Sequence, residues 1–388
     1  MLVDFITKTQ MLERNNHSVD YFWPVGIDYG FSAIKGFAPN KVFCFPNCAI
    51  KIDPDILGKV LDVSDTDMVY RCNGETWIVG EKAYSVMTGA EAMNYESEMY
   101  ERNRYFSPSF RVLMDVGLGM AIASNAVRRY KGENLVIETG LPPKYKDNDS
   151  ELLREALAGD HEFDLRIGKG RFLHYRFQVR ENGVYIIDQP MGSLISAITD
   201  NDGRQSPADS IILKSNTIVM DPGFKTLDIY DISAGMFRSS HTFDTLGMYE
   251  IFKRTASELN RIYKADVSVA EMQALLRKGY VTSFDRKTMQ SRRIPFDDVL
   301  IKNSNAVCDE ALGKIFSIYN YLRDHDNLIL TGGTGNAWEP IIRERFSNME
   351  SLRVISANKN DPGISNTFSN VRGYYLFLVS MLERQIRK

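Results

Sequence analysis

The chain alternates short apolar runs, typical of buried strands, with longer segments whose apolar residues recur at helical spacing. Helical spacing is found at residues 110–130, 245–262, 269–278, 304–322 and 371–386. Apolar runs that predict strands ending at loops lie at 134–142 and 327–335. Alternating strands and helices predict α/β domains with mixed sheets.

Two nearly equivalent turn signatures stand about half a chain apart. One apolar run ends at Asp28-x-Gly30 and another at Asp221-x-Gly223, and each continues into a second apolar stretch. This pattern predicts a hairpin with a carboxylate at its tight turn. Glycine lets backbone N–H groups approach a phosphate, and an aspartate beside it can hold a hydrated Mg²⁺ ion. We therefore expect a duplicated domain whose two turns face a cleft and clamp the phosphates of a nucleotide.

Composition narrows the class of protein. The 388 residues are 44% hydrophobic and 25% charged, with a formal net charge of −3, so a basic surface for direct nucleic-acid binding is not expected. Because no apolar run reaches the length of a membrane span, we expect a cytoplasmic protein. The four cysteines include one C-x₃-C pair, Cys44 and Cys48, but no second pair or nearby histidine completes a zinc site, so reduced core thiols are predicted.

Five glycine-containing and acidic elements occur in one order along the chain. They are Asp28-x-Gly30 with Lys35, the segment 187–190, a loop at 221–228, a glycine turn at 331–335 and the segment 370–373. This series resembles the nucleotide-binding core of actin, sugar kinases and the 70-kilodalton heat-shock chaperones, in which the second and fifth elements begin the two crossover helices between domains. Segment 79–83, Gln189-Pro190-x-Gly192 and the D-P-G second loop are similar to bacterial and archaeal actin-like ATPases of the ParM type.

The resemblance implies duplicated actin-like, ribonuclease H-like domains with mixed sheets flanking a nucleotide cleft. Domain I is expected at 1–185 with 370–388, carrying an insertion at about 37–105. Domain II is expected at 186–369, with an insertion at about 256–303.

Within this family, Gln189 and Asp221 are the implied catalytic residues, with Gln189 positioning the attacking water. Asp28 and Asp221 would hold Mg²⁺ through its water molecules, and Lys35 would neutralise the β- and γ-phosphates. The alternative for each residue is local: an aspartate capping its own turn, an exposed strand lysine, and a glutamine bonded at a helix start. The implied nucleotide-binding residues are Asp28, Gly30, Phe31, Ser32, Lys35, Gly223, Phe224, Lys225, Thr226, Glu250, Lys253, Gly332, Gly333, Thr334 and Gly335.

The sequence departs from the family pattern at both phosphate loops. Phe31 stands where actin has a serine that touches the γ-phosphate, and Ser32 is the candidate substitute. Phe224 and Lys225 replace the paired glycines of the chaperones. Glu250 and Lys253 fall where the family contacts the ribose and adenine.

Two local alternatives remain open. Glu250 could instead form a surface ion pair with Lys253 or Arg254. Thr226 and Asp228 could contact phosphate and order the waters of the metal, or simply close the hairpin.

Residues 1–22 have no counterpart in the family. Apolar side chains at positions 2, 3, 5, 6, 11 and 12 suggest a short amphipathic helix against a neighbouring subunit or a membrane. A terminal helix packed on its own domain and a disordered arm are the alternatives.

The expected function is that of a filament-forming ATPase that polymerises with nucleotide to segregate plasmid or phage DNA. Its expected ligands are Mg²⁺ and ATP, with GTP as an alternative. Its expected partners are further copies of itself and a DNA-binding adaptor protein. Two other readings are a membrane-associated cell-shape or division actin and a small-molecule kinase of the same superfamily.

Overall fold

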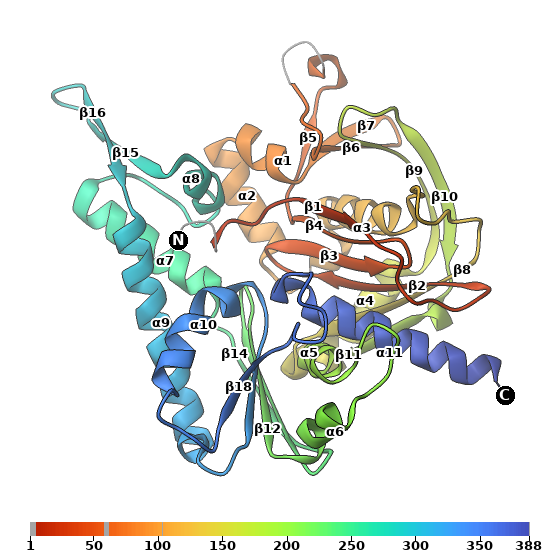
Figure 1. Cartoon of the computed structure of the whole chain (residues 1–388). Helices are drawn as coiled ribbons and strands as arrows, with labels where there is room; N and C mark the ends of the chain where they lie inside the picture. The colour runs from red at the N-terminus through yellow and green to blue at the C-terminus, as the bar shows by residue number, and fades with distance from the viewer. Residues whose placement is uncertain (1–4, 58–61, 103, 388) are drawn as a thin grey trace.

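The computed structural model describes residues 5–57, 62–102 and 104–387, and it shows two lobes (Figure 1). Lobe I is built on a six-stranded sheet. Its order is β1 (Gln10–Glu13), β4 (Lys41–Pro46), β3 (Ala33–Ala38), β2 (Phe22–Tyr29), β8 (Asn134–Leu141) and β11 (Val184–Asp188). Lobe II is built on a five-stranded sheet, in the order β14 (Met236–Phe243), β13 (Leu227–Ser233), β12 (Thr217–Pro222), β17 (Asn327–Leu330) and β18 (Arg353–Ser356).

The two sheets share one topology, which confirms the predicted α/β duplication. In lobe I the antiparallel series β2–β3–β4 is extended on its other side by β8 and β11, which run parallel to β2. In lobe II the antiparallel series β12–β13–β14 is extended in the same way by β17 and β18. Both sheets are therefore mixed.

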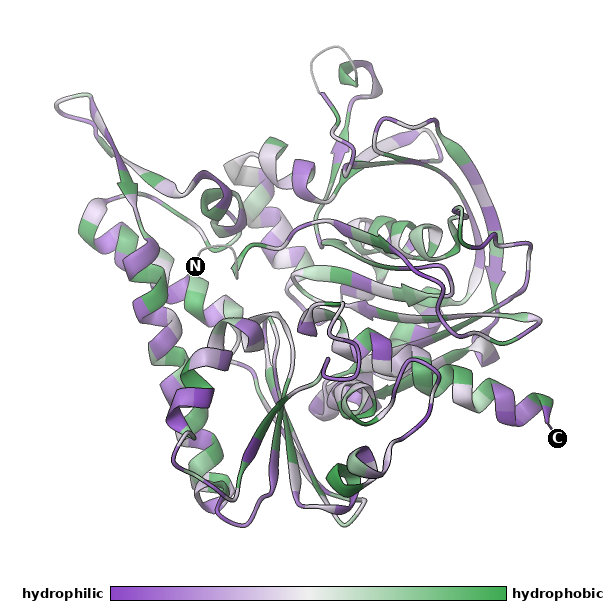
Figure 2. Ribbon diagram, viewed as in Figure 1, coloured by the Kyte–Doolittle hydropathy of each residue, from purple (hydrophilic) through white to green (hydrophobic). Residues whose placement is uncertain are grey.

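Helices enclose these sheets. Lobe I contains α1 (Glu81–Val86), α2 (Gly89–Met99), α3 (Pro108–Ile122), α4 (Pro143–Leu157) and the closing helix α11 (Ser369–Ile386). Lobe II contains α5 (Gln189–Ile198), α6 (Pro207–Lys214), α7 (Met248–Tyr263), α8 (Met272–Lys278), α9 (Asp297–Ile318) and α10 (Gly333–Arg345). Figure 2 shows hydrophobic positions concentrated on α3, which is enclosed within lobe I and is buried along almost its whole length.

A second, curved sheet covers α3. Its order is β10 (Leu173–Val179), β9 (Gly159–Ile167), β6 (Met68–Cys72), β7 (Glu75–Val79) and β5 (Ala49–Ile52). The insertion expected at 37–105 therefore differs from the structure, because β4 belongs to the six-stranded sheet and β9–β10 complete the inserted one. In lobe II, β15 (Tyr280–Asp285) and β16 (Gln290–Pro295) form a separate hairpin within the expected insertion at 256–303.

Most predicted helices are present with shifted ends. The helix expected at 110–130 stops at Ile122, and the one expected from 304 begins at Asp297. The prediction of a helix near the N-terminus was wrong for residues 6–22, which contain β1 and extended chain, because β1 pairs with the edge strand β4. Leu2 and Val3 lie outside the described residues. In the part of the chain that the structure covers, no helix is both long and apolar enough to cross a bilayer.

Helices α5 and α11 cross at direct backbone contact between Gly192 and Gly373. A Cβ atom placed on Gly373 would lie 1.7 Å from the carbonyl oxygen of Gly192. Because that neighbour is backbone, no side-chain rotation could relieve the overlap. The crossing fixes where both helices begin, and both begin at the cleft between the lobes.

Replacing Gly373 with alanine should lower the free energy of unfolding by about 3 kcal/mol, because the helices must separate. Denaturant unfolding followed by circular dichroism measures this change. The matched control is Gly313→Ala on α9, where a Cβ would meet nothing within 4 Å and the helix should gain up to about 1 kcal/mol. A Gly373→Ala protein as stable as the parent would contradict the crossing.

Candidate functional site

The two predicted turns are equivalent hairpins with one chemical difference. In the β2–β3 hairpin Asp28 stands opposite Lys35, and in the β12–β13 hairpin Asp221 stands opposite Asp228. The Lys35 Nζ atom lies 3.1 Å from the Asp28 Oδ2 atom. The first turn therefore carries a balanced ion pair, whereas the second carries two carboxylates.

Both turns open on one cavity between the lobes. Its volume is about 320 Å³, at the lower end of the range for ligand pockets. Lobe I contributes Ser32, Ala33 and Lys35, and lobe II contributes Gln189, Asp221, Gly223, Phe224, Met248, Gly332, Gly333, Thr334 and Asn336. The turns thus face each other, as the duplication predicted.

Asp221 is held by the first residues of both crossing helices. Its Oδ2 atom accepts hydrogen bonds from Gln189 Nε2 at 3.1 Å and from Asn370 Nδ2 at 2.8 Å. Ser193 donates to the side-chain oxygen of Asn370, which fixes the orientation of that amide. The carboxylate is therefore aimed by α5 and α11 together.

Lys35 connects the two turns electrostatically. Burial alone would lower the pKa of Lys35, but the nearby carboxylates of Asp28 and Asp221 outweigh it and the pKa is raised. The lysine therefore carries its positive charge at the cavity wall. Burial also raises the pKa of Asp221, against the opposing effects of Asn370 and Lys35.

The glycine turn after β17 closes the cavity from lobe II. Gly332 has a φ of +82°, and a Cβ atom there would lie 2.8 Å from Asp221 Oδ1. Only glycine fits this left-handed conformation and close approach without strain. The next turn residues are tied to the second hairpin, because the Thr334 hydroxyl donates to the carbonyl oxygen of Gly223 at 2.8 Å.

Comparison with known proteins agrees with this arrangement. Residues 26–192 match the model of the N-terminal domain of actin-like proteins. A 15-stranded ParM filament from Clostridium botulinum superposes with a TM-score of 0.70 at 20% identity, covering 92% of this chain and 98% of that one. The chain has an actin-like fold. Comparison with curated protein sequences gives no match.

Two further solved structures show the same fold. The non-polymerisable quadruple mutant of pCBH ParM gives a TM-score of 0.69 at 19% identity over 92% of this chain and 98% of that one. The archaeal actin homologue Ta0583 in complex with ADP gives 0.58 at 17% identity over 93% and 99%. The expected resemblance to bacterial and archaeal actin homologues is confirmed.

The actin-like first loop presents Ser32, not Phe31, to the cavity. Ser32 lines the cavity, while the Phe31 ring packs under the guanidinium of Arg104, whose carbon lies 4.0 Å from the ring centroid. In the second loop Lys225 reaches across to the backbone oxygen of Tyr100 in lobe I. Thr226 bonds to Asp228 at 2.9 Å, within the hairpin.

Helix α7 contributes Met248 to the cavity wall, whereas Glu250 and Lys253 on the same helix line a different part of the surface. Glu250 forms an ion pair with Arg254 at 2.9 Å, the alternative left open by the sequence. Lys253 lies with Glu250 and Arg254 in a separate, open surface depression. In the described structure neither Glu250 nor Lys253 is among the residues that line the cavity.

Two groups of site residues were not predicted. Ser193 and Asn370 orient Asp221; Asn370 was expected only as the start of a crossover. The N-terminal segment also lines the cavity, through Phe5, Ile6, Thr7, Lys8 and Gln10. Nothing in the local pattern of that segment indicates a cleft, because its position depends on pairing with β4.

The site fits a hydrated Mg²⁺ ion better than a directly ligated metal. No group of three or more histidine, cysteine, aspartate or glutamate residues arranged for direct ligation lies within the described ranges. The buried carboxylate of Asp221 lines the cavity and can instead accept hydrogen bonds from metal-bound waters, the mode that Mg²⁺ commonly uses beside phosphates. Asp28 pairs with Lys35 and is not among the described residues that line the cavity.

Asp228 should make stability depend on pH. Its side chain is buried, and burial raises its pKa from 3.8 to about 7. Between these values the folded protein keeps a proton that the unfolded chain releases, so the free energy of unfolding falls as pH rises, by up to about 4 kcal/mol. Asp228→Asn should remove most of this loss and raise the melting temperature at pH 8.

Thermal unfolding without nucleotide, from pH 4.5 to 8, measures the effect. Asp55→Asn, at an exposed carboxylate, is the control and should keep the parental profile. An Asp228→Asn protein with the parental pH profile would show that Asp228 is ionised throughout.

Proposed function

We propose that this actin-like protein binds and hydrolyses ATP and assembles into filaments that segregate plasmid or phage DNA. GTP is the alternative nucleotide. The observation that carries the proposal is the convergence of both hairpin turns and the turn at Gly332 on one cavity. Glycine turns let a phosphate approach the backbone closely, and Lys35 adds a positive charge beside them.

Each residue of the cavity has a distinct task in this proposal. Lys35 and Ser32 contact the terminal phosphates from lobe I, and Gly223 approaches them from lobe II. Asp28 and Asp221 accept hydrogen bonds from the water shell of Mg²⁺. The chemistry that the bound metal supplies is neutralisation of charge on the phosphate oxygens.

In this proposal Gln189 positions the attacking water. Its amide nitrogen donates to Asp221, which leaves its carbonyl oxygen free to accept a hydrogen bond from water. Positioning supplies most of the catalysis in phosphoryl transfer. Asp221 therefore has two roles in this proposal: it orders the waters bound to the metal, and it orients Gln189.

Nucleotide would control assembly by holding the lobes together. The triphosphate contacts both hairpins, so it favours the closed cleft, and hydrolysis removes one of those contacts. Each subunit would present one surface to a different surface of the next, a contact that does not close and so builds a filament. The neighbour from Clostridium botulinum was solved as such a filament.

Cargo contact would be indirect. A net charge of −3 gives little general attraction for DNA, which favours an adaptor protein between filament and DNA in the cytoplasm. The apolar stretch at residues 374–382 is largely buried in α11 against lobe I, which gives no support to the alternative of a membrane-associated actin.

Replacing Gln189 with alanine should slow phosphate release by roughly two orders of magnitude while ATP-dependent assembly persists, because water positioning is lost and phosphate binding is kept. Phosphate release and pelleting with ATP, ADP and no nucleotide measure both properties. The control is Gln385→Ala, at an exposed position of α11, which should match the parent.

Two outcomes would count against this function. Pelleting that is independent of nucleotide in the parent protein would separate the cavity from assembly. Phosphate release that requires an added sugar or small acid would favour a kinase of the same superfamily.

A further inference from the structure

The N-terminal segment crosses from one lobe to the other beside the nucleotide cavity. Figure 1 shows the start of the described chain next to α8 of lobe II, from where it runs to β1 at the edge of the lobe I sheet. Residues 5–14 are named the strap here. Its contacts with lobe II lie at both of its ends.

The N-terminal end of the strap is hydrogen-bonded to one side chain of α8. Gln273 donates from Nε2 to the carbonyl oxygen of Phe5 at 3.1 Å, and its Oε1 atom accepts from the backbone nitrogen of Thr7 at 3.1 Å. Phe5 and Gln273 are both buried. A glutamine that satisfies a donor and an acceptor of an extended chain holds it in one register.

Two charged side chains, Arg277 and Glu81, add further hydrogen bonds to this end of the strap. Arg277, one turn further along α8, donates to the carbonyl oxygen of Thr7 and lies 3.4 Å from Glu81 of lobe I. Glu81 in turn accepts a hydrogen bond from the backbone nitrogen of Thr9. The strap is therefore held between α8 and the start of α1.

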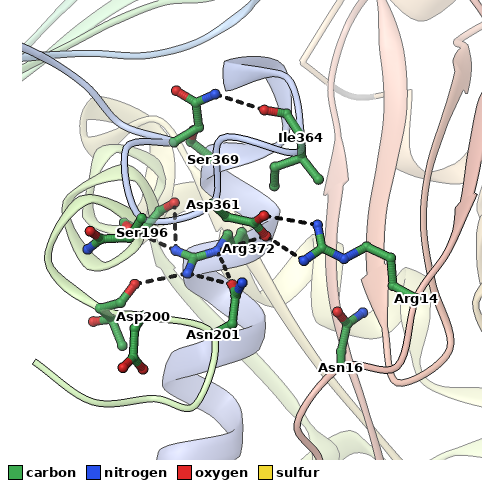
Figure 3. Close-up of polar contacts among 12 residues, drawn as sticks. Arg14, Asn16, Ser196, Asp200, Asn201, Asp361, Ile364, Ser369 and Arg372 are labelled. Carbon is green, nitrogen blue, oxygen red and sulfur yellow. Dashed lines mark hydrogen bonds and ion pairs between the residues drawn. The ribbon is translucent and has the colours of Figure 1, made fainter.

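The second end is fixed by ion pairs. Arg14 contacts Asp361 of lobe II through both terminal nitrogens, at 3.1 and 2.8 Å (Figure 3). Asp361 also faces the buried Arg372 at 3.5 Å, whose guanidinium donates to Asn201 and to backbone oxygens of Ser196 and Thr199. This anchor is thus part of a buried network at the base of α11.

Between its anchors the strap forms a wall of the cavity. Phe5, Ile6, Thr7, Lys8 and Gln10 line the same space as Lys35, Asp221 and Gly333. Lys8 and Gln10 are exposed as well as lining the cavity, so they stand at its opening. A ligand that enters the cavity through this opening therefore passes beside Lys8 and Gln10 of the strap.

We propose that the strap is the outer wall of the nucleotide site and that its release from α8 sets the rate at which nucleotide enters and leaves. The inference rests on the proposed function of the cavity. Bound nucleotide and the strap would stabilise each other, because each bridges the same two lobes. Lys8 adds a positive charge at the opening, where a polyphosphate first arrives.

Removing the hydrogen bonds between Gln273 and the strap tests the proposal. Gln273→Ala removes two hydrogen bonds to the strap and should raise the dissociation rate of a fluorescent ATP analogue by about tenfold. Stopped-flow displacement by excess ATP measures this rate. Arg14→Ala, at the other anchor, should raise it independently, and Lys278→Ala, exposed on the same helix, is the control with parental kinetics.

Hydrogen exchange of residues 5–14 reports strap opening without nucleotide. Faster exchange in Gln273→Ala, together with the faster dissociation, is the expected result. Faster exchange with an unchanged dissociation rate would overturn the role of the strap while leaving the nucleotide site intact. If the parent protein failed to bind the analogue at all, the proposed function itself would be contradicted.

Discussion

The arrangement of the cleft depends on the backbone contact between Gly192 and Gly373. Because α5 and α11 cross without intervening side chains, their first turns lie close enough for Gln189 and Asn370 to share one oxygen of Asp221. One crossing therefore connects the two lobes and aims the carboxylate that faces the cavity. Any larger residue at the crossing would move the amides away from Asp221 and separate the lobes at the same point.

The charges around the cleft are not balanced within the protein. Three buried aspartates, at positions 28, 221 and 228, stand near the half-buried Lys35, and the exposed Lys8 lines the same cavity. Such a site repels an isolated phosphate but suits a phosphate that arrives with a divalent cation. The raised pKa of Asp228 is the result of the same imbalance, since burial and the neighbouring Asp221 both favour its neutral form. This charge distribution favours the proposed nucleotide–magnesium ligand over a bare anion.

The sequence predicts the local parts of this site well. The hairpins at Asp28 and Asp221 and the turn at Gly332 follow from apolar runs that end in glycine, because such signals lie within a few residues. Helix ends were shifted, as at Ile122, where capping and packing decide the boundary. The similarity of the two hairpin signals also predicted the duplication, which the matching topology of the two sheets confirms.

Features set by distant segments could not be predicted. The curved sheet combines strands that precede α3 in the sequence, such as β6, with strands that follow it, such as β9. Its extent therefore depends on the pairing of β6 with β9. The course of residues 5–14 depends on pairing with β4 and on Gln273, some 270 residues away. The direction of a side chain also depends on tertiary packing. Glu250 forms an ion pair with Arg254, although its helix α7 borders the cavity through Met248.

In the proposed function, both hairpin turns bind one nucleotide. The most direct measurement is a structure of the protein with Mg²⁺ and a non-hydrolysable ATP analogue. The expected density places the triphosphate between Ser32 and Gly223, with the terminal phosphate near Lys35 and Gln189. Nucleotide density outside this cavity, or none at saturating analogue, would contradict the claim.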